Sequence, residues 1–196
     1  IMPNLDPPIT TLNQAQEYKK RIIQCIPEGV SFTPLMTAYL TDNMPTEVLE
    51  SGFKEGVFYG AKLYPANVTT NSSYGVTNID KIDNLFETME RIGMPLLIHG
   101  EVTDIKVDVF DREAVFIERH LEPLLQRFPS LKVVLEHITT IDAIDFIENS
   151  DFDIAATITP HHLHINRNAM FNGGLRSDFY CLPTAKREIH RIALRQ

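Results

Sequence analysis

The segment KVVLEH, residues 132–137, is an apolar run that ends in a histidine. Two earlier segments have a similar form: VFYGAKLY (57–64) carries a lysine, Lys62, near its end, and PLLIH (95–99) ends in another histidine. Short runs of Val, Leu, Ile, Phe and Tyr with little polar alternation are typical of strands that are covered on both faces. We therefore expect strands here and in three further runs, which are Ile1–Leu5, Phe32–Leu40 and Ile154–Ile158.

Helical patterns separate these strand candidates. A capping box begins at Thr11, and a pattern over residues 79–92 ends at Gly93, which can adopt the left-handed conformation of a helix terminus. A third helix is expected from Asp111, with a kink or break at Pro123. The first helix should bury one stripe, made of Ala15, Tyr18, Ile22 and Cys25. Strands that alternate with helices predict a parallel α/β sheet.

The composition is that of a globular domain. The 196 residues are 43% hydrophobic and 22% charged, and 18 Lys and Arg against 26 Asp and Glu give a net charge of −8. This negative charge argues against nucleic acid as a partner, and no apolar run is long enough to cross a membrane. Cys25 and Cys181 show no metal or disulfide spacing, so we expect both to be buried thiols. We also expect a cytoplasmic protein of one domain.

Three polar residues recur at strand ends. Lys62, His99 and His137 are 37 and 38 residues apart, which is the length of one βα repeat. In a (β/α)₈ barrel, the C-terminal ends of successive strands meet at one mouth. Asn4 and Thr159 occupy comparable positions in the outer repeats. The sequence therefore predicts a ring of these five residues around a pocket.

The residue types in this ring suggest a metal site. Neutral imidazoles suit Zn²⁺, but the ammonium group of a lysine would be repelled by the metal. One solution is carbamylation, in which a neutral amine takes up CO₂ and becomes an anion that can bridge two metal ions. The ordinary alternatives stay open at this point: structural histidines, and a lysine that is salt-bridged or extends along the surface.

Other polar segments are less specific. The stretch Tyr64–Thr77 reads as a loop after a strand, and it is either functional or an ordinary mobile connector. His161, His162 and His164 resemble a metal cluster, but they follow a proline in a polar segment without a nearby acidic residue. We interpret these three histidines as loop residues, which could lie near the mouth of the pocket.

Two carboxylates adjoin the strand-end histidines. Glu101 shares the strand parity of His99 and could act as an acid or base, whereas Glu136 should face away from the barrel. GxSxG, GxGxxG and P-loop patterns are absent, so serine-hydrolase, dinucleotide and NTPase functions have no support.

Five segments in this order resemble the dihydroorotases of pyrimidine biosynthesis, in the bacterial-type class of the amidohydrolase superfamily: IMPNLDPPITT, AKLYPANVTTNSSYGVT, GMPLLIHGEVT, KVVLEHITT and NGGLRSDFYCLPTAKR. The resemblance implies a (β/α)₈ TIM barrel over residues 1–196, incomplete because the first and last strands lack counterparts. It also implies a two-zinc centre that is bridged by carbamylated Lys62, with His99 and His137 binding one of the zinc ions.

The same resemblance assigns substrate contacts. Asn4 matches an asparagine that holds the substrate carboxylate, and Leu182 matches a residue whose backbone meets the pyrimidine amide. Thr69 and Thr70 match the pair on a mobile loop that closes over N-carbamoyl-L-aspartate. The implied reaction is the reversible cyclisation of that compound to L-dihydroorotate, and the implied assembly is a homodimer.

Some family features have no counterpart in these residues, namely an HxH pair, an arginine just after it and a strand-end aspartate. We therefore expect the central part of a longer protein, and we assign no catalytic acid or base. Two alternatives remain open: another cyclic amidohydrolase of the hydantoinase type, and a dihydroorotase-like assembly partner without catalytic activity.

Overall fold

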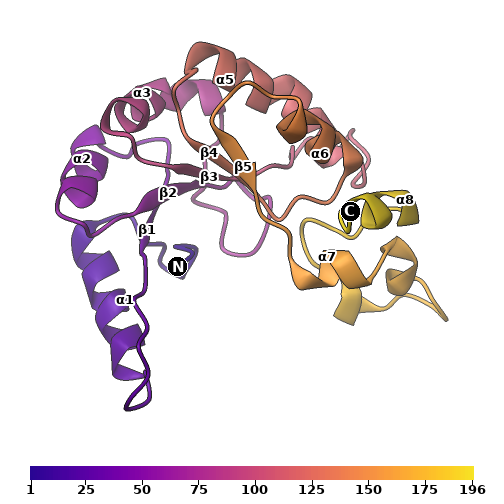
Figure 1. The fold of residues 1–196 in the computed structure, drawn as a ribbon, viewed down its shortest axis with the longest axis horizontal. Coiled ribbons are helices and arrows are strands. Elements are labelled where there is room, and N and C mark those ends of the chain that lie inside the picture. The colour runs from indigo at the N-terminus through magenta and orange to yellow at the C-terminus, as the bar shows by residue number, and fades with distance from the viewer. The chain divides into compact units, whose positions relative to one another are not determined.

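Helices and strands alternate between Leu12 and Ala156, and only helical elements follow, as Figure 1 shows for the computed structural model of residues 1–196. The residues form two units, Ile1–Leu97 and Ile98–Gln196. Strand β3 (Leu96–His99) contains the boundary between them. None of the helices has both the length and the apolar character that crossing a bilayer requires.

The first unit contains two complete strands and their helices. Its elements are α1 (Leu12–Gln24), β1 (Thr37–Tyr39), α2 (Thr46–Lys54), β2 (Gly60–Leu63), the 3₁₀ turn η1 (Ile79–Ile82) and α3 (Asp83–Ile92). Strands β1 and β2 are parallel, and Tyr39 pairs with Lys62. Every residue of both strands is buried, as expected for a sheet that is covered on two faces.

The second unit continues the alternation. Its elements are α4 (Arg112–Phe116), the π-helical turn η2 (Ile117–Leu121), α5 (Glu122–Arg127), β4 (Val133–Glu136), α6 (Ile141–Glu148), β5 (Ile154–Ala156), α7 (Pro160–His164), the 3₁₀ turns η3 (Arg167–Met170) and η4 (Ser177–Phe179), and α8 (Glu188–Ala193). Strands β4 and β5 are parallel, with Leu135 opposite Ala156. Parallel strands that are joined by helices are the repeating unit of a TIM barrel.

The local signals for helix ends are confirmed. Thr11 caps α1 through both bonds of a capping box with Gln14, and Gly93 ends α3 with φ of 71°. The third predicted helix is irregular as expected, because the π-helical turn η2 interrupts its regular bonding just before α5, whose second residue is Pro123. A proline has no N–H to donate, so the regular helical bonding pattern is interrupted there.

Several expectations about strands and burial are wrong. Ile1–Leu5 is not a strand, because the amides of Leu5 and Ile9 both donate to the Pro3 carbonyl in a turn. Of the stripe predicted on α1, only Ala15 is buried. Both Cys25 and Cys181 are exposed and not buried.

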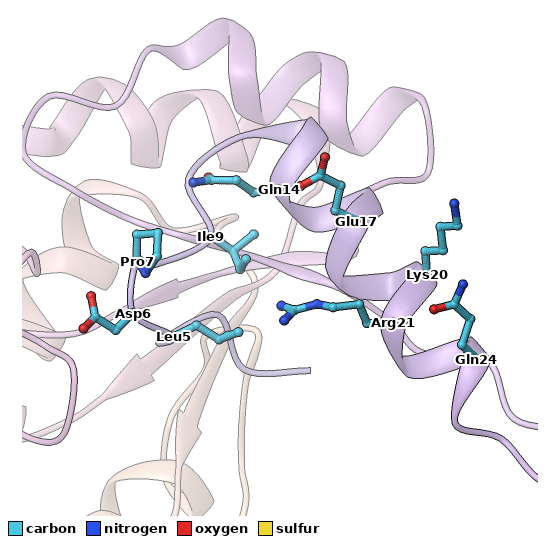
Figure 2. A pocket seen from close by; sticks show the side chains of 9 residues that line it. All are labelled: Leu5, Asp6, Pro7, Ile9, Gln14, Glu17, Lys20, Arg21 and Gln24. Atoms are coloured by element: carbon cyan, nitrogen blue, oxygen red, sulfur yellow. The ribbon is translucent and has the colours of Figure 1, made fainter.

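Another face of α1 borders a pocket of the first unit. This pocket of about 650 Å³ lies between α1 and the segment Leu5–Ile9, and Figure 2 shows Glu17, Lys20 and Arg21 along its helical side. The residues of the predicted stripe do not line it. None of the residues predicted for the metal site lines this pocket.

Candidate metal centre and substrate loop

The residues predicted for the site lie in both units. The first unit holds the lysine at the end of β2, Asn4 and the loop threonines Thr69 and Thr70. The second unit holds the two strand-end histidines and Leu182.

Lys62 is fully buried at the third position of β2. Its Nζ lies 5.2 Å from the ring centroid of Tyr64, two residues further on, so the ammonium group is within cation–π distance. Tyr64 in turn stacks on Tyr39, with ring centroids 5.2 Å apart. A lysine that extends along the surface to water is therefore excluded, and the amine is inside the protein.

His99 and His137 are brought together in the second unit. Their rings meet edge to face, with centroids 4.6 Å apart. His99 is the last residue of β3 and is buried, while His137 directly follows β4 and is half-buried. The φ of His137 is 47°, which is uncommon outside glycine. Its amide donates to the Thr157 hydroxyl at 2.8 Å, which helps to hold this conformation.

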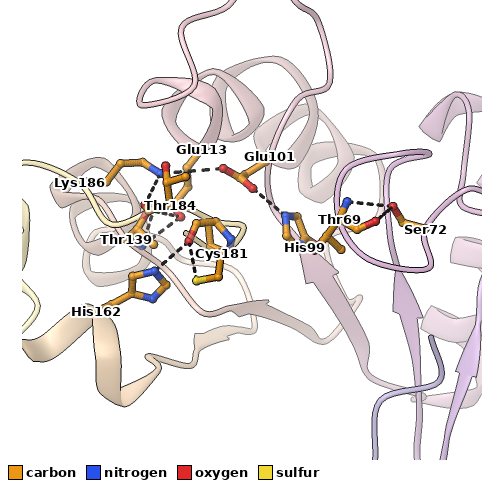
Figure 3. A network of polar contacts seen from close by, with 11 residues as sticks. Thr69, Ser72, His99, Glu101, Glu113, Thr139, His162, Cys181, Thr184 and Lys186 are labelled. Carbon is orange, nitrogen blue, oxygen red and sulfur yellow. Dashed lines mark hydrogen bonds and ion pairs between the residues drawn. The ribbon is translucent and has the colours of Figure 1, made fainter. Parts of the chain in front are cut away.

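Glu101 fixes the ring of His99. The carboxylate oxygen Oε2 lies 2.8 Å from Nε2 of His99, and both side chains are 1% exposed (Figure 3). A carboxylate only accepts hydrogen bonds, so the ring proton lies on Nε2 and the lone pair on Nδ1. Glu101 was a candidate acid or base from its sequence parity, but this contact makes it a positioning residue.

A buried lysine adjoins this pair. The Nζ of Lys186 lies 3.9 Å from Glu101 Oε1 and donates to the Thr184 carbonyl at 2.9 Å. Burial lowers the pKa of Lys186, and the charges of Glu113 and Glu101 oppose that shift. Sequence analysis did not find Lys186, because a lysine near the start of a helical segment normally lies at the surface.

Glu113 of α4 holds the chain just after His137. Its two oxygens accept hydrogen bonds from the Thr139 amide at 2.9 and 3.0 Å (Figure 3), and also from the Thr139 and Thr140 hydroxyls. Burial raises the pKa of Glu113, while Lys186 and these hydrogen bonds oppose the shift. The carboxylate therefore links α4 to the turn that carries His137.

The loop Tyr64–Thr77 is tied down at its base. The Tyr64 hydroxyl donates to Asn4 Oδ1 at 3.0 Å, and Asn4 Nδ2 donates to the Thr70 carbonyl at 3.2 Å. The Thr69 amide donates to Ser72 Oγ at 2.9 Å. Thr70 itself is exposed. The structure therefore joins two of the predicted substrate residues, Asn4 and Thr70, in one hydrogen-bonded unit.

Leu182 and Thr159, the last two residues predicted for the site, also lie in the second unit. Leu182 is half-buried and precedes Pro183 through a cis peptide bond. Thr159 begins α7, so His161, His162 and His164 lie on a short helix and not in a loop, which corrects the interpretation of those histidines. The proline that suggested a loop occupies the first position of α7, where its missing N–H costs nothing.

Comparison with known proteins identifies the relatives of the chain. It is 67% identical over all 196 residues to the dihydroorotases of Synechococcus sp. (strain CC9605) and Parasynechococcus marenigrum (strain WH8102), of which it covers 56% and 57%. The chain belongs to the dihydroorotase family. No family model matches it. The chain therefore spans a little over half the length of the curated dihydroorotases that it matches.

Solved dihydroorotases have the same fold. The enzyme from Campylobacter jejuni superimposes with a TM-score of 0.89 at 39% identity, over 99% of this chain and 55% of the other. The Saccharomyces cerevisiae dihydroorotase, in complex with 5-fluoroorotic acid, gives 0.86 at 34%, over 99% and 56%. An L-hydantoinase from Arthrobacter aurescens gives 0.81 at 18% and shares the fold alone. The predicted partial TIM barrel is therefore confirmed.

Gly75 offers a test of the loop of this dihydroorotase-family chain. A Cβ atom at Gly75 would lie 2.3 Å from the Tyr64 carbonyl oxygen, which is backbone and cannot rotate away. We expect Gly75→Ala to destabilise the loop by about 1–3 kcal/mol and to speed hydrogen exchange at the Val76 amide. Ser73→Ala, at an exposed position in the same loop, is the control. Unchanged exchange in Gly75→Ala would contradict this view of the loop.

Proposed function

We propose that this chain carries part of the active site of a dihydroorotase, which reversibly cyclises N-carbamoyl-L-aspartate to L-dihydroorotate in pyrimidine biosynthesis. The main support is the pair of imidazoles in edge-to-face contact, one of which is oriented by a buried carboxylate. A buried lysine at the end of β2 adds to this support. Sequence identity of 67% to a curated dihydroorotase supports this reaction.

The residues fit a zinc centre. Lys62, His99 and His137 would hold the metal, with Lys62 as N6-carboxylysine. His99 would bind through Nδ1, because Glu101 takes the Nε2 hydrogen, and this is the usual outer-shell arrangement of a metal-binding histidine. Zinc bound there would polarise the amide carbonyl and lower the pKa of a water molecule.

Carbamylation of Lys62 is chemically consistent with its surroundings. The neutral amine attacks CO₂, a C–N bond forms, and one proton leaves to give a carbamate anion. Full burial favours the neutral form of an amine, which is the form that reacts. The carbamate supplies two oxygen donors where the free lysine would supply a cation.

Most of the proposed substrate contacts lie in the first unit, and Leu182 of the second unit adds one more. The Tyr64 hydroxyl orients the Asn4 amide by donating to its oxygen, so the amide nitrogen is directed as a donor. One of its two hydrogens bonds to Thr70, and the second would hold the substrate carboxylate. Thr69 and Thr70 would exclude water when the loop closes, and the Leu182 backbone would meet the ring amide.

The family resemblance also supports a homodimer in the cytoplasm. Sedimentation would test the dimer, and cell fractionation would test the location.

A cyclic amidohydrolase of the hydantoinase type is the second candidate function, since an L-hydantoinase shares the fold. Turnover of dihydroorotate and of hydantoin by the same preparation separates the two. We expect hydrolysis of dihydroorotate to be far faster.

Metal removal tests the zinc centre. We expect chelation of the longest protein that contains this chain to abolish dihydroorotate turnover, and added zinc to restore it. Mass spectrometry of the metal content should follow the activity in parallel. Activity that persists in metal-free protein would refute the zinc centre, while zinc-loaded protein without any turnover would favour the inactive assembly partner.

A further inference from the structure

Three metal-ligating side chains meet in the second unit outside the proposed zinc ligands. They are His161 and His162 of α7 and Cys181, which is 20 residues away in sequence from His161. The ligand atoms of all three lie within 4.8 Å of one another. The closest pair is Cys181 Sγ and His161 Nε2, at 3.1 Å.

The hydrogen bonds of His162 prepare one of its nitrogens for a metal. Nε2 lies 3.0 Å from the Pro183 carbonyl oxygen, which can only accept, so Nε2 carries the proton (Figure 3). The lone pair is then on Nδ1. A ring whose far nitrogen donates to a backbone carbonyl is the usual state of a metal-binding histidine. Because His162 is only 2% exposed, its ring is held in this orientation.

The Thr159 hydroxyl marks the point where the two rings converge. Its Oγ1 lies 2.6 Å from His162 Nδ1 and 3.3 Å from His161 Nε2. Both ring nitrogens are therefore directed at the same small volume, next to the sulfur of Cys181.

The site is open on one side. His161 and Cys181 are exposed and line a surface groove together with Phe179 and Tyr180. An ion can therefore enter from solvent, and water can complete its coordination. Burial lowers the pKa of His162 to about 4, so its ring is neutral, and burial raises the pKa of the Cys181 thiol, so a metal ion must displace the thiol proton.

We propose that His161, His162 and Cys181 bind a soft or borderline divalent cation such as Zn²⁺ or Cd²⁺. One thiolate and two neutral imidazoles form a donor set that such ions prefer over Mg²⁺ or Ca²⁺. On binding, the S–H bond of Cys181 breaks, the sulfur–metal bond forms, and one proton is released to solvent. None of the three residues belongs to the set proposed for the zinc centre.

Two thiols in one chain allow an internal comparison. Cys25 and Cys181 are both exposed, but only Cys181 has histidines beside it. In the longest protein that contains this chain, with zinc already in the proposed centre, we expect added Zn²⁺ to slow alkylation of Cys181 and not of Cys25. Peptide mapping by mass spectrometry measures both rates. Equal protection of the two thiols, or protection of neither, would overturn the proposal.

Cadmium titration identifies the ligands, because a thiolate bound to Cd²⁺ gives a charge-transfer absorption in the ultraviolet. We expect one equivalent to bind to the protein and to Cys25→Ser with the same affinity, and Cys181→Ser to lose the band. His161→Ala should weaken binding by about tenfold or more, whereas His164→Ala, on the same helix, should not. Circular dichroism checks that each variant is folded.

The outcomes separate a three-residue site from a reactive thiol. A band that persists in Cys181→Ser refutes the assigned sulfur. A band that is lost in Cys181→Ser but unchanged in His161→Ala shows binding by the thiol alone and also overturns the site. Because His161 is exposed, its replacement is expected to leave the fold intact even if Cys181→Ser does not fold.

Discussion

Replacing Lys62 by alanine is expected to remove bound zinc and to lower dihydroorotate turnover by about 10³-fold or more. The reason is that carbamylated Lys62 would supply an anionic ligand to the zinc, and the methyl group of alanine cannot replace it. Inductively coupled plasma mass spectrometry measures the metal, and steady-state kinetics measures the turnover. The loss should appear in kcat, because the change removes the chemistry and not a substrate contact.

Two further variants separate a carbamate from an ordinary buried lysine. Lys62→Arg keeps a cation but cannot form the same carbamate, so it should be as damaging as alanine. Lys81→Ala changes an exposed lysine of the same unit and should have no effect. In the protein without substitutions, ¹³C-labelled bicarbonate should give a carbamate signal in the ¹³C NMR spectrum. This signal should be absent from Lys62→Arg. An active Lys62→Arg protein would refute the carbamate.

Glu113→Ala is expected to be the most destabilising single change outside the proposed metal ligands. It would leave a buried amide and two buried hydroxyls without their acceptor, and it would remove a charge partner of buried Lys186. Loss of one partner from a buried charged network costs about 3–5 kcal/mol. Chemical denaturation followed by circular dichroism measures the free energy of unfolding.

Matched substitutions show whether the network or the helix is responsible. Glu113→Gln keeps one acceptor oxygen and should lose only part of the stability. Glu118→Ala changes an exposed glutamate in the next helical turn and should be nearly neutral. A Glu113→Ala protein as stable as Glu118→Ala would show that these hydrogen bonds contribute little.

Local signals in the sequence predicted much of the fold. The capping box at Thr11, the left-handed Gly93 and the interruption at Pro123 each depend on a few neighbouring residues, and all three are found. The five strands lie within predicted runs but are shorter, because only part of each run pairs with a neighbour. The stripe on α1 was wrong, since periodicity shows that a face is apolar and not what covers it.

The candidate site was predictable only in part. The spacing of His99 and His137 predicted that they meet, and their rings do. Glu113, Lys186 and the cluster at Cys181 depend on contacts between residues far apart in the chain, which no local pattern encodes. Cys181 was expected to be buried because free cysteines usually are, but its exposure is what allows the proposed metal to enter.

The positive φ of His137 limits how this position can be altered, by experiment or by evolution. Asparagine and aspartate tolerate that backbone conformation better than other residues with a side chain, whereas valine or isoleucine would add strain of order 1–3 kcal/mol. A β-branched replacement would therefore confuse a misfolded turn with a missing ligand. Replacement of His137 by asparagine therefore tests the loss of the imidazole ligand without adding strain to the backbone.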